Sequence, residues 1–142
     1  MTDVKISKET NASAEDVKLV EDALHRFNFE VTRIPYAPQP VTLFLREESG
    51  EIKGGLIGSI FAGWLAVSTL WIDEKYRHQG YGGKLLQVAE AEARDAGCKY
   101  ARLDTFEFQA RPFYERFGYE CFGVLNDHPL GHTHYFMSKR LK

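Results

Sequence analysis

The spacing of apolar residues predicts an amphipathic helix near the start of the chain. Ser13 can cap this helix, and two acidic residues follow in the first turn, where the helix dipole favours negative charge. The apolar side chains recur every three or four residues up to about residue 27, so they share one face. These residues are Val17, Val20, Leu24 and Phe27.

Two further helices are predicted later in the chain. Segment 80–96 has apolar residues on one face and charged residues, including Glu90, at the other positions, and Gly97 suits the place after its last turn. The apolar face is formed by Leu85, Leu86, Ala89 and Ala93. A shorter helix over about 110–117 tolerates Pro112 in its first turn and ends at Gly118.

Apolar runs between turn residues predict the strands. Segments 41–46, 52–61 and 65–72 are joined by short turns and form an antiparallel meander, with the mostly apolar third strand near the centre. Helix 80–96 then leads to a strand at 100–104, which predicts a parallel pair with a helical crossover. Shorter strands are expected at 4–6, 119–124 and 134–139.

Together these elements predict an α/β fold. The sheet is expected to be mixed and strongly twisted, with about six to seven strands flanked by about three to four helices. The chain has 142 residues, of which 44% are hydrophobic and 27% charged, and this is the composition of a folded domain. A single domain over residues 1–142 is therefore expected.

Charge and cysteine content favour a cytoplasmic protein. The net charge of -2 shows no excess of the basic residues that nucleic acid attracts. Cys98 and Cys121 lack metal-ligand spacing and are expected as free thiols in a reducing compartment. The first residues lack the apolar stretch of a signal peptide, and no apolar run reaches the ~18 residues of a membrane span. Neither a nucleic-acid nor a membrane partner is expected.

Three histidines lie close together near the end of the chain, at His128, His132 and His134. Such a cluster is able to bind a transition metal. The segment also contains Pro129 and Gly131, however, and these are typical of a loop before a final strand. We therefore expect no metal site.

A glycine-rich segment separates the central strand from the long helix. Its residues are Arg77, His78, Gln79, Gly80, Tyr81, Gly82, Gly83 and Lys84. Glycines let the backbone approach a ligand, and the free N–H groups at a helix start attract an anion such as a pyrophosphate. Leu85 breaks both the dinucleotide fingerprint and the phosphate-loop motif of nucleoside triphosphatases. A tight turn without a ligand stays open as the alternative.

Two motifs in order resemble the GCN5-related N-acetyltransferase (GNAT) family. Arg77-x-x-Gly80-x-Gly82 matches the family pattern Gln/Arg-x-x-Gly-x-Gly/Ala. The segment from Ala110 to Tyr119 is similar to the second family motif, Ala-x-x-x-Tyr-x-x-x-Gly-Phe/Tyr. The resemblance covers about residues 41–142. The wording Thr105-Phe106-x-Phe108-Gln109-Ala110, with the later Pro129-x-Gly131-His132, is similar to one bacterial subgroup of small acetyltransferases.

This resemblance implies acetyl-CoA as the cosubstrate. The central strand would pair its backbone with the pantetheine arm, and the glycine-rich turn would hold the pyrophosphate. Tyr114 matches the family tyrosine that protonates the departing thiolate, which a phenol is able to do. The implied cofactor contacts are Leu70, Trp71, Ile72, Arg77, His78, Gln79, Gly80, Tyr81, Gly82, Gly83, Lys84 and Tyr114.

A base is needed to remove a proton from the acceptor ammonium group. Asp104, at the predicted end of a strand, and Glu107 are the two candidates, and the sequence does not choose between them. Glu107 also stands nearest the place where many family members have Asn. The contact of that Asn with pantetheine is therefore not implied here.

The sequence thus predicts an acetyl-CoA-dependent N-acetyltransferase that moves an acetyl group to a primary amine by direct attack on the thioester. The acceptor is a small-molecule amine or a peptide or protein amine. A non-catalytic acyl-CoA sensor or partner module on the same fold is the alternative, and Tyr114 favours catalysis. The oligomeric state stays open, with a symmetric homodimer as the commonest assembly.

Overall fold

The computed structural model describes residues 3–141. The chain forms two compact units, one that ends at Tyr36 and one that begins at Ala37, and each is described by itself. In this described range, no helix has both the length and the apolar character needed to cross a membrane.

The first unit contains helix α1 (Ala14–Thr32). Ser13 caps this helix as predicted, since its Oγ accepts a hydrogen bond from the N–H of Asp16 at 3.1 Å. The helix continues beyond Phe27 because residues 28–32 contain no glycine or proline to end it. It ends at Arg33, which has a left-handed φ of 61°.

The strand predicted at residues 4–6 is wrong. These residues have no regular secondary structure, and Val4 and Ile6 are fully exposed. A run this short forms a strand only where a neighbouring strand satisfies its backbone groups. After α1 the chain turns back, and the ring of Tyr36 stacks on His25 with ring centroids 3.7 Å apart.

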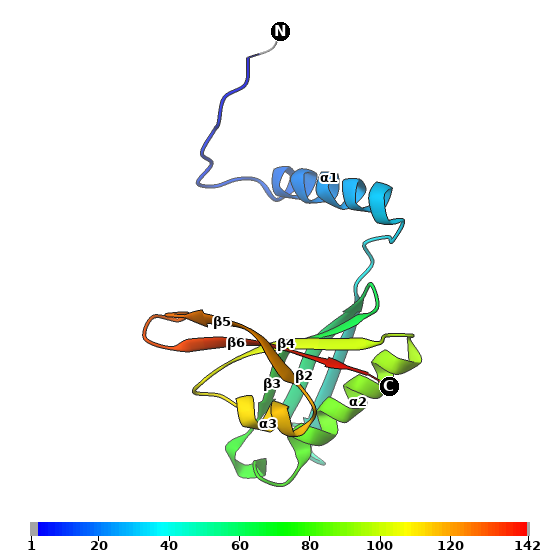
Figure 1. Cartoon of the computed structure of the whole chain (residues 1–142), viewed down its shortest axis with the longest axis vertical. Helices are drawn as coiled ribbons and strands as arrows, with labels where there is room; N and C mark the ends of the chain where they lie inside the picture. The colour runs from blue at the N-terminus through cyan, green and yellow to red at the C-terminus, as the bar shows by residue number, and fades with distance from the viewer. Residues whose placement is uncertain (1–2, 142) are drawn as a thin grey trace. The chain divides into compact units, whose positions relative to one another are not determined.

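The second unit is built on one six-stranded sheet with the order β1-β2-β3-β4-β6-β5 (Figure 1). The strands are β1 (Gln39–Arg46), β2 (Ile52–Phe61), β3 (Trp64–Ile72), β4 (Tyr100–Phe106), β5 (Glu120–Asn126) and β6 (Thr133–Arg140). Neighbouring strands are antiparallel except for β3 and β4, which are parallel. The predicted α/β fold, with its meander and its parallel pair, is confirmed.

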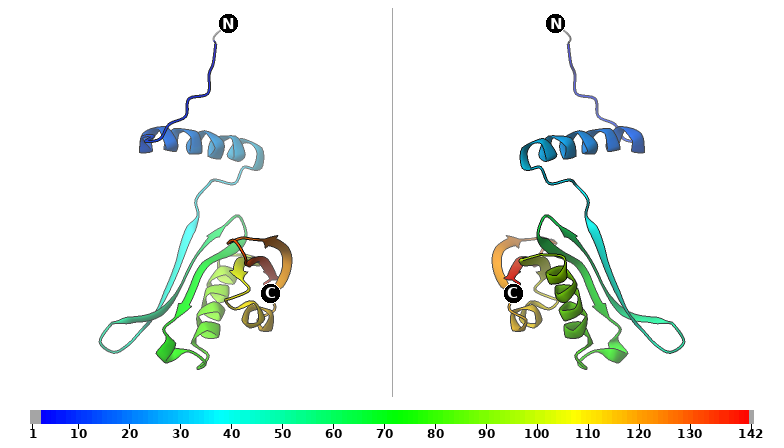
Figure 2. Two further views of the ribbon diagram at one scale, coloured as in Figure 1. Left: turned by 90° about the vertical axis from the view of Figure 1, so that its left-hand side faces the viewer. Right: turned by 90° about the vertical axis from the view of Figure 1, so that its right-hand side faces the viewer.

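Two helices pack on this sheet. Helix α2 (Tyr81–Asp95) forms the crossover between β3 and β4 and lies along the sheet, and α3 (Arg111–Arg116) follows β4 (Figures 1 and 2). Alternate strand residues meet the apolar face of α2, because successive side chains of a strand point to opposite faces. This core includes Val41, Leu56, Leu65, Val67, Leu86, Ala89, Ala93, Ala101, Leu103 and Met137. Each fully buried leucine contributes roughly 1.5–3 kcal/mol.

Glu90 departs from the sequence prediction, which placed it off the apolar face of its helix. Its side chain is buried, with 2% of the residue exposed. The hydroxyl of Tyr119 and the Nζ of Lys139 each donate a hydrogen bond to its carboxylate at 2.8 Å. Burial, with the charge of Glu90 second, raises the pKa of Tyr119, so this phenol stays a donor. The carboxylate thus links α2 to the segment before β5 and to β6.

Replacing Glu90 with Ala is expected to lower the free energy of unfolding by about 3 kcal/mol, because it leaves a buried phenol and a largely buried ammonium group without their acceptor. Glu92→Ala on the same helix is the matched control, since residue 92 is exposed, and its effect should stay within about 0.5 kcal/mol. Urea unfolding measures both. Equal stability of the two variants would contradict the role given to Glu90.

Candidate active site

The site begins where β3 and β4 stop pairing. Their parallel register runs from Trp64↔Tyr100 to Val67↔Leu103, although β3 continues to residue 72 and β4 to residue 106. Ser68 is the extra residue of a bulge against β2, and its hydroxyl donates to the carbonyl of Ile57 at 2.9 Å. A bulge bends its strand and increases the local twist. The bend in β3 therefore opens a fork between the two parallel strands.

A cavity of about 720 Å³ lies at this fork, next to the start of α2 and to α3. Most of its lining side chains are apolar or aromatic, and two arginines provide positive charge. The lining residues are Leu70, Trp71, Ile72, Tyr76, Arg77, His78, Gly80, Tyr81, Gly82, Gly83, Thr105, Phe108, Gln109, Ala110, Phe113, Tyr114, Arg116 and Phe117.

The glycine-rich turn forms one wall of the cavity. A short 3₁₀ helix, η1 (Glu74–Tyr76), leads into it, and two left-handed residues follow: His78 with φ 62° and Gly80 with φ 85°. The first bond inside α2 runs from the N–H of Lys84 to the carbonyl of Gly80. The N–H groups ahead of Lys84 therefore lack partners within the helix, and together with the helix dipole they suit an anion.

The three glycines of the turn have different reasons to be glycine. Gly80 needs its positive φ. A Cβ on Gly83 would lie 2.4 Å from the ring of Phe117, so this glycine lets α2 and α3 pack together. A Cβ on Gly82 would meet only ordinary contact with Phe113 at 3.4 Å. A Cβ on Gly80 would meet no atom, but the φ there is strained for other residues, so of these three only Gly82 could take a side chain without strain or collision, and that side chain would lie beside Phe113 in the cavity.

Most of the residues predicted to contact a cofactor line this cavity, but two do not. Gln79 donates its side-chain amide to the carbonyl of Lys75 at 3.2 Å, and the ammonium group of Lys84 lies 5.4 Å from the centre of the Tyr81 ring. Both point to other parts of the turn. Arg77 lines the cavity, but its Nε donates to the carbonyl of Ile72 at 2.8 Å, so it also holds the end of β3.

Tyr114 lies on α3 and lines the same cavity as the glycine-rich turn. Only 8% of the residue is exposed. Burial, with the negative charge of Asp104 as the second cause, raises the pKa of Tyr114 to about 12. Its hydroxyl therefore keeps its proton at neutral pH and is able to donate it.

The two candidate bases are placed differently. Asp104 is the first residue of β4 beyond the last pair with β3, and its carboxylate contacts the Nε2 of His134 at 2.7 Å. Glu107 lies in the turn after β4, where its carboxylate contacts the Nδ1 of His132 at 2.8 Å. This hydrogen bond is the main reason that the pKa of Glu107 is lowered. Neither carboxylate belongs to the cavity wall.

Several lining residues were missed by the sequence reasoning. Phe113 and Phe117, which follow the helical spacing of an apolar face, both line the cavity. Gln109 accepts hydrogen bonds from Thr105 and from the backbone of Phe106, both at 3.0 Å, and so shapes the turn beside the cavity. Only its place next to the second family motif could have indicated this role.

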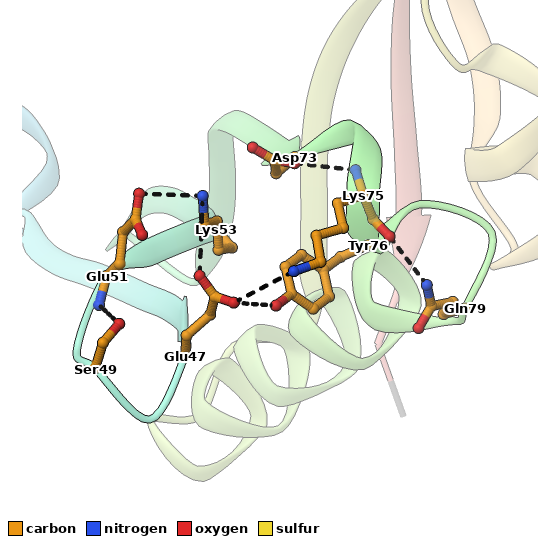
Figure 3. A network of polar contacts seen from close by, with 8 residues as sticks. All are labelled: Glu47, Ser49, Glu51, Lys53, Asp73, Lys75, Tyr76 and Gln79. Atoms are coloured by element: carbon orange, nitrogen blue, oxygen red, sulfur yellow. Dashed lines mark hydrogen bonds and ion pairs between the residues drawn. The ribbon is translucent and has the colours of Figure 1, made fainter.

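Tyr76 was also missed, and it anchors the turn to the β1–β2 hairpin (Figure 3). Its hydroxyl donates to the carboxylate of Glu47 at 2.5 Å, and Lys53 and Lys75 lie within 3.9 Å of the same carboxylate. This hydrogen bond is the main cause that raises the pKa of Tyr76 to about 12 and lowers that of Glu47. Asp73 accepts from the backbone N–H of Lys75 at 2.9 Å. The start of the glycine-rich turn is thereby fixed to a neighbouring hairpin.

The three histidines of the 128–134 segment make different contacts: His128 contacts His134, and His132 and His134 each contact a carboxylate, as described above. The Nδ1 atoms of His128 and His134 are 2.6 Å apart. Within residues 3–141, no group of three or more metal-ligating side chains is arranged to hold an ion.

Comparison with known proteins identifies the family. The model of the acetyltransferase (GNAT) family matches residues 9–119. Acetyltransferase Atu2258 of Agrobacterium fabrum is 35% identical over 130 residues, which cover 91% of this chain and 93% of that protein. Blasticidin-S acetyltransferase of Streptomyces morookaense is 41% identical over 95 residues, which cover 66% of this chain and 70% of that enzyme.

Solved structures agree with this family. The 1.9 Å crystal structure of an acetyltransferase from Bacillus cereus has a TM-score of 0.86 and 34% identity, over 95% of this chain and 98% of that one. The named relatives are enzymes, which favours catalysis over the alternative of a binding module. The chain therefore belongs to the GNAT family of N-acetyltransferases, enzymes that use acetyl-CoA as the acetyl donor.

Proposed function

We propose that acetyl-CoA binds in the cavity at the fork, with its pantetheine arm beside β3 and its pyrophosphate at the start of α2. Leu70 to Ile72 pair with β2 but not with β4, so the edge of β3 that faces the fork is able to form strand-like hydrogen bonds with the amides of pantetheine. The free N–H groups of the glycine-rich turn suit the pyrophosphate, and Arg77 and Arg116 add positive charge. The observation that carries the proposal is that this turn, the part of β3 beyond its pairing with β4, and Tyr114 all line one cavity.

The acceptor is a primary amine that attacks the thioester directly. Its nitrogen lone pair forms a bond to the carbonyl carbon, and the carbon–sulfur bond then breaks, so that the thiolate takes the electron pair. Tyr114 gives its hydroxyl proton to this sulfur, and the second proton that the nitrogen loses as the amide forms returns through water to the Tyr114 oxygen, so each turnover restores the phenol. The chain contributes orientation and proton transfer, without a covalent intermediate on the protein.

The amine arrives as an ammonium ion and must lose a proton before it attacks. Asp104 and Glu107 are the proposed bases, acting directly or through water. Both come from the end of β4 and the turn that follows it, next to the open part of the fork.

We propose a small-molecule amine as the acceptor, in preference to a peptide or protein amine. A curated relative with 41% identity is named for a small antibiotic, blasticidin S.

The match to the family model starts at residue 9 and includes α1, which supports one N-acetyltransferase domain over residues 1–142. A cytoplasmic location is proposed because the two cysteines suit a reducing compartment. A symmetric homodimer is proposed because it is the commonest assembly of soluble proteins.

Acetyl transfer is expected to at least one small primary amine. The measurement is release of free CoA thiol from acetyl-CoA across a library that includes nucleoside antibiotics, polyamines, amino-sugar compounds and short peptides. Product mass, increased by one acetyl group, confirms transfer over simple hydrolysis. Saturable acetyl-CoA binding without transfer to any amine would contradict the proposed function.

Replacing Gly82 with Val is expected to weaken acetyl-CoA binding by more than about tenfold while the protein stays folded, since the added side chain enters the cavity. Gly83→Ala is the matched comparison, because its methyl group collides with Phe117 and should destabilise the fold by about 1–3 kcal/mol. Calorimetric titration and thermal unfolding distinguish the two effects. Unchanged affinity in folded Gly82→Val would exclude this placement of the pyrophosphate.

Tyr114→Phe is expected to lower kcat by about tenfold to a hundredfold, because the thiolate loses its proton donor while the ring still packs. Acetyl-CoA affinity should change little. Since the pKa of Tyr114 is raised to about 12, its deprotonation should produce no loss of wild-type activity up to about pH 10. Turnover within about twofold of wild type, with chemistry rate-limiting, would exclude Tyr114 as the acid.

A further inference from the structure

Three side chains form a hydrogen-bonded row that starts at the fork. The Oδ2 of Asp104 contacts the Nε2 of His134 at 2.7 Å, and the Nδ1 of His134 contacts the Nδ1 of His128 at 2.6 Å. The middle member is the buried one, because 6% of the His134 side chain is exposed against 49% for Asp104. The row therefore joins a partly exposed carboxylate to a buried imidazole.

The imidazole of His134 packs against neighbouring rings. Phe106 lies at 4.3 Å and Phe136 at 4.5 Å between ring centroids, and His128 stacks at 4.7 Å. A ring fixed in this way keeps its nitrogen atoms aimed at the same partners. The orientation of the Asp104 carboxylate is therefore set by a rigid neighbour.

The hydrogen-bond chemistry of the row specifies which atoms carry the protons. An ionised carboxylate only accepts, so the Nε2 of His134 must be the donor to Asp104. In neutral His134 the Nδ1 is then an acceptor, and the Nδ1 of His128 must donate to it. This arrangement uses one oxygen of Asp104 and leaves Oδ1 available to another group.

The position of Asp104 suits contact with an incoming amine. Thr105, the next residue of β4, lines the proposed cofactor cavity, and successive strand residues point to opposite faces. Asp104 therefore points to the face of the sheet opposite to the cavity-lining Thr105, at the open end of the fork. Its charge still reaches Tyr114, where it helps to raise the pKa of that phenol.

We propose that Asp104 is the base that takes the ammonium proton and that His134, fixed by His128, is the positioning residue that orients its carboxylate. This assignment rests on the proposed transfer of acetyl to an amine. The ammonium proton moves to Oδ1 of Asp104, and the freed nitrogen lone pair attacks the thioester. The proton leaves Oδ1 to solvent after the product departs, so each turnover restores the carboxylate.

Glu107 is a poorer choice for this role. Its partner, His132, has 46% of its side chain exposed, against 6% for His134, so no buried ring fixes the Glu107 carboxylate. Exposed pairs of this kind are screened by water and are held weakly. The pair nevertheless provides a matched control, because it has the same chemical groups in the same region of the chain.

The first test needs no acceptor. Long-range ¹H–¹⁵N correlation spectra of the histidine rings report which nitrogen carries the proton. We expect His134 protonated at Nε2, and we expect its ring signals to shift in Asp104→Asn while those of His132 stay in place. A proton on Nδ1 alone would overturn the proposed hydrogen-bond row.

The second test separates positioning from structure. His134→Phe retains the aromatic packing but lacks the donor, so kcat at pH 7 should fall about tenfold, with acetyl-CoA affinity within about twofold. His134→Gln has an amide N–H for Asp104 and should regain part of the loss. His132→Phe, the matched control, should stay within about twofold of wild type.

The dependence of kcat on pH, measured with the best amine of the library as acceptor, distinguishes a positioning role of His134 from a merely structural one. A neutral amine needs no base, so the deficits of His134→Phe and Asp104→Asn should shrink as the pH approaches the pKa of that amine. A deficit of constant size, or an unchanged kcat in His134→Phe, would overturn the positioning role while leaving acetyl transfer intact. A wild-type protein that acetylates no amine would overturn both proposals.

Discussion

The site depends on one interruption, the point where β3 leaves β4. Two parallel strands at the centre of a sheet normally satisfy each other's backbone along their length. Here the bulge at Ser68 bends β3 directly after its last pair with β4, and β2 follows the bend. Gly58 makes this possible, because a Cβ at that position would lie 2.5 Å from the carbonyl oxygen of Ala66. A ligand that pairs with the exposed strand edge replaces the missing neighbour.

The interruption also separates two kinds of chemistry. On the side of α2 and α3, helix N–H groups, arginines and aromatic rings provide an environment for a long anionic molecule with an apolar middle. On the opposite face, Asp104 and His134 provide negative charge and hydrogen-bond capacity. The fork is the place where the two sides meet, so donor and acceptor can approach the same carbon atom from different directions.

The sequence predicted those features that have a local signal. The capped α1, the meander and the parallel crossover follow from spacing and turn residues, and the glycine-rich turn follows from its motif. The burial of Glu90 had no such signal, because its partners Tyr119 and Lys139 lie 29 and 49 residues away. The opposite error, a strand at residues 4–6, has the same origin, since a strand depends on a partner that its own residues do not specify.

The parts of the site that have a local motif were also predictable, and the contacts between distant residues were not. The motifs indicated the wall formed by β3, the turn and Tyr114, but they gave no sign of the anchor between Tyr76 and Glu47. The sequence alone offered no reason to prefer Asp104 or Glu107 as the base. They differ in the structure because the first contacts a buried imidazole packed against aromatic rings and the second contacts an exposed one. Burial removes the freedom of the imidazole and strengthens its contact with the carboxylate, so His134 is better suited than His132 to hold a carboxylate ready for proton transfer.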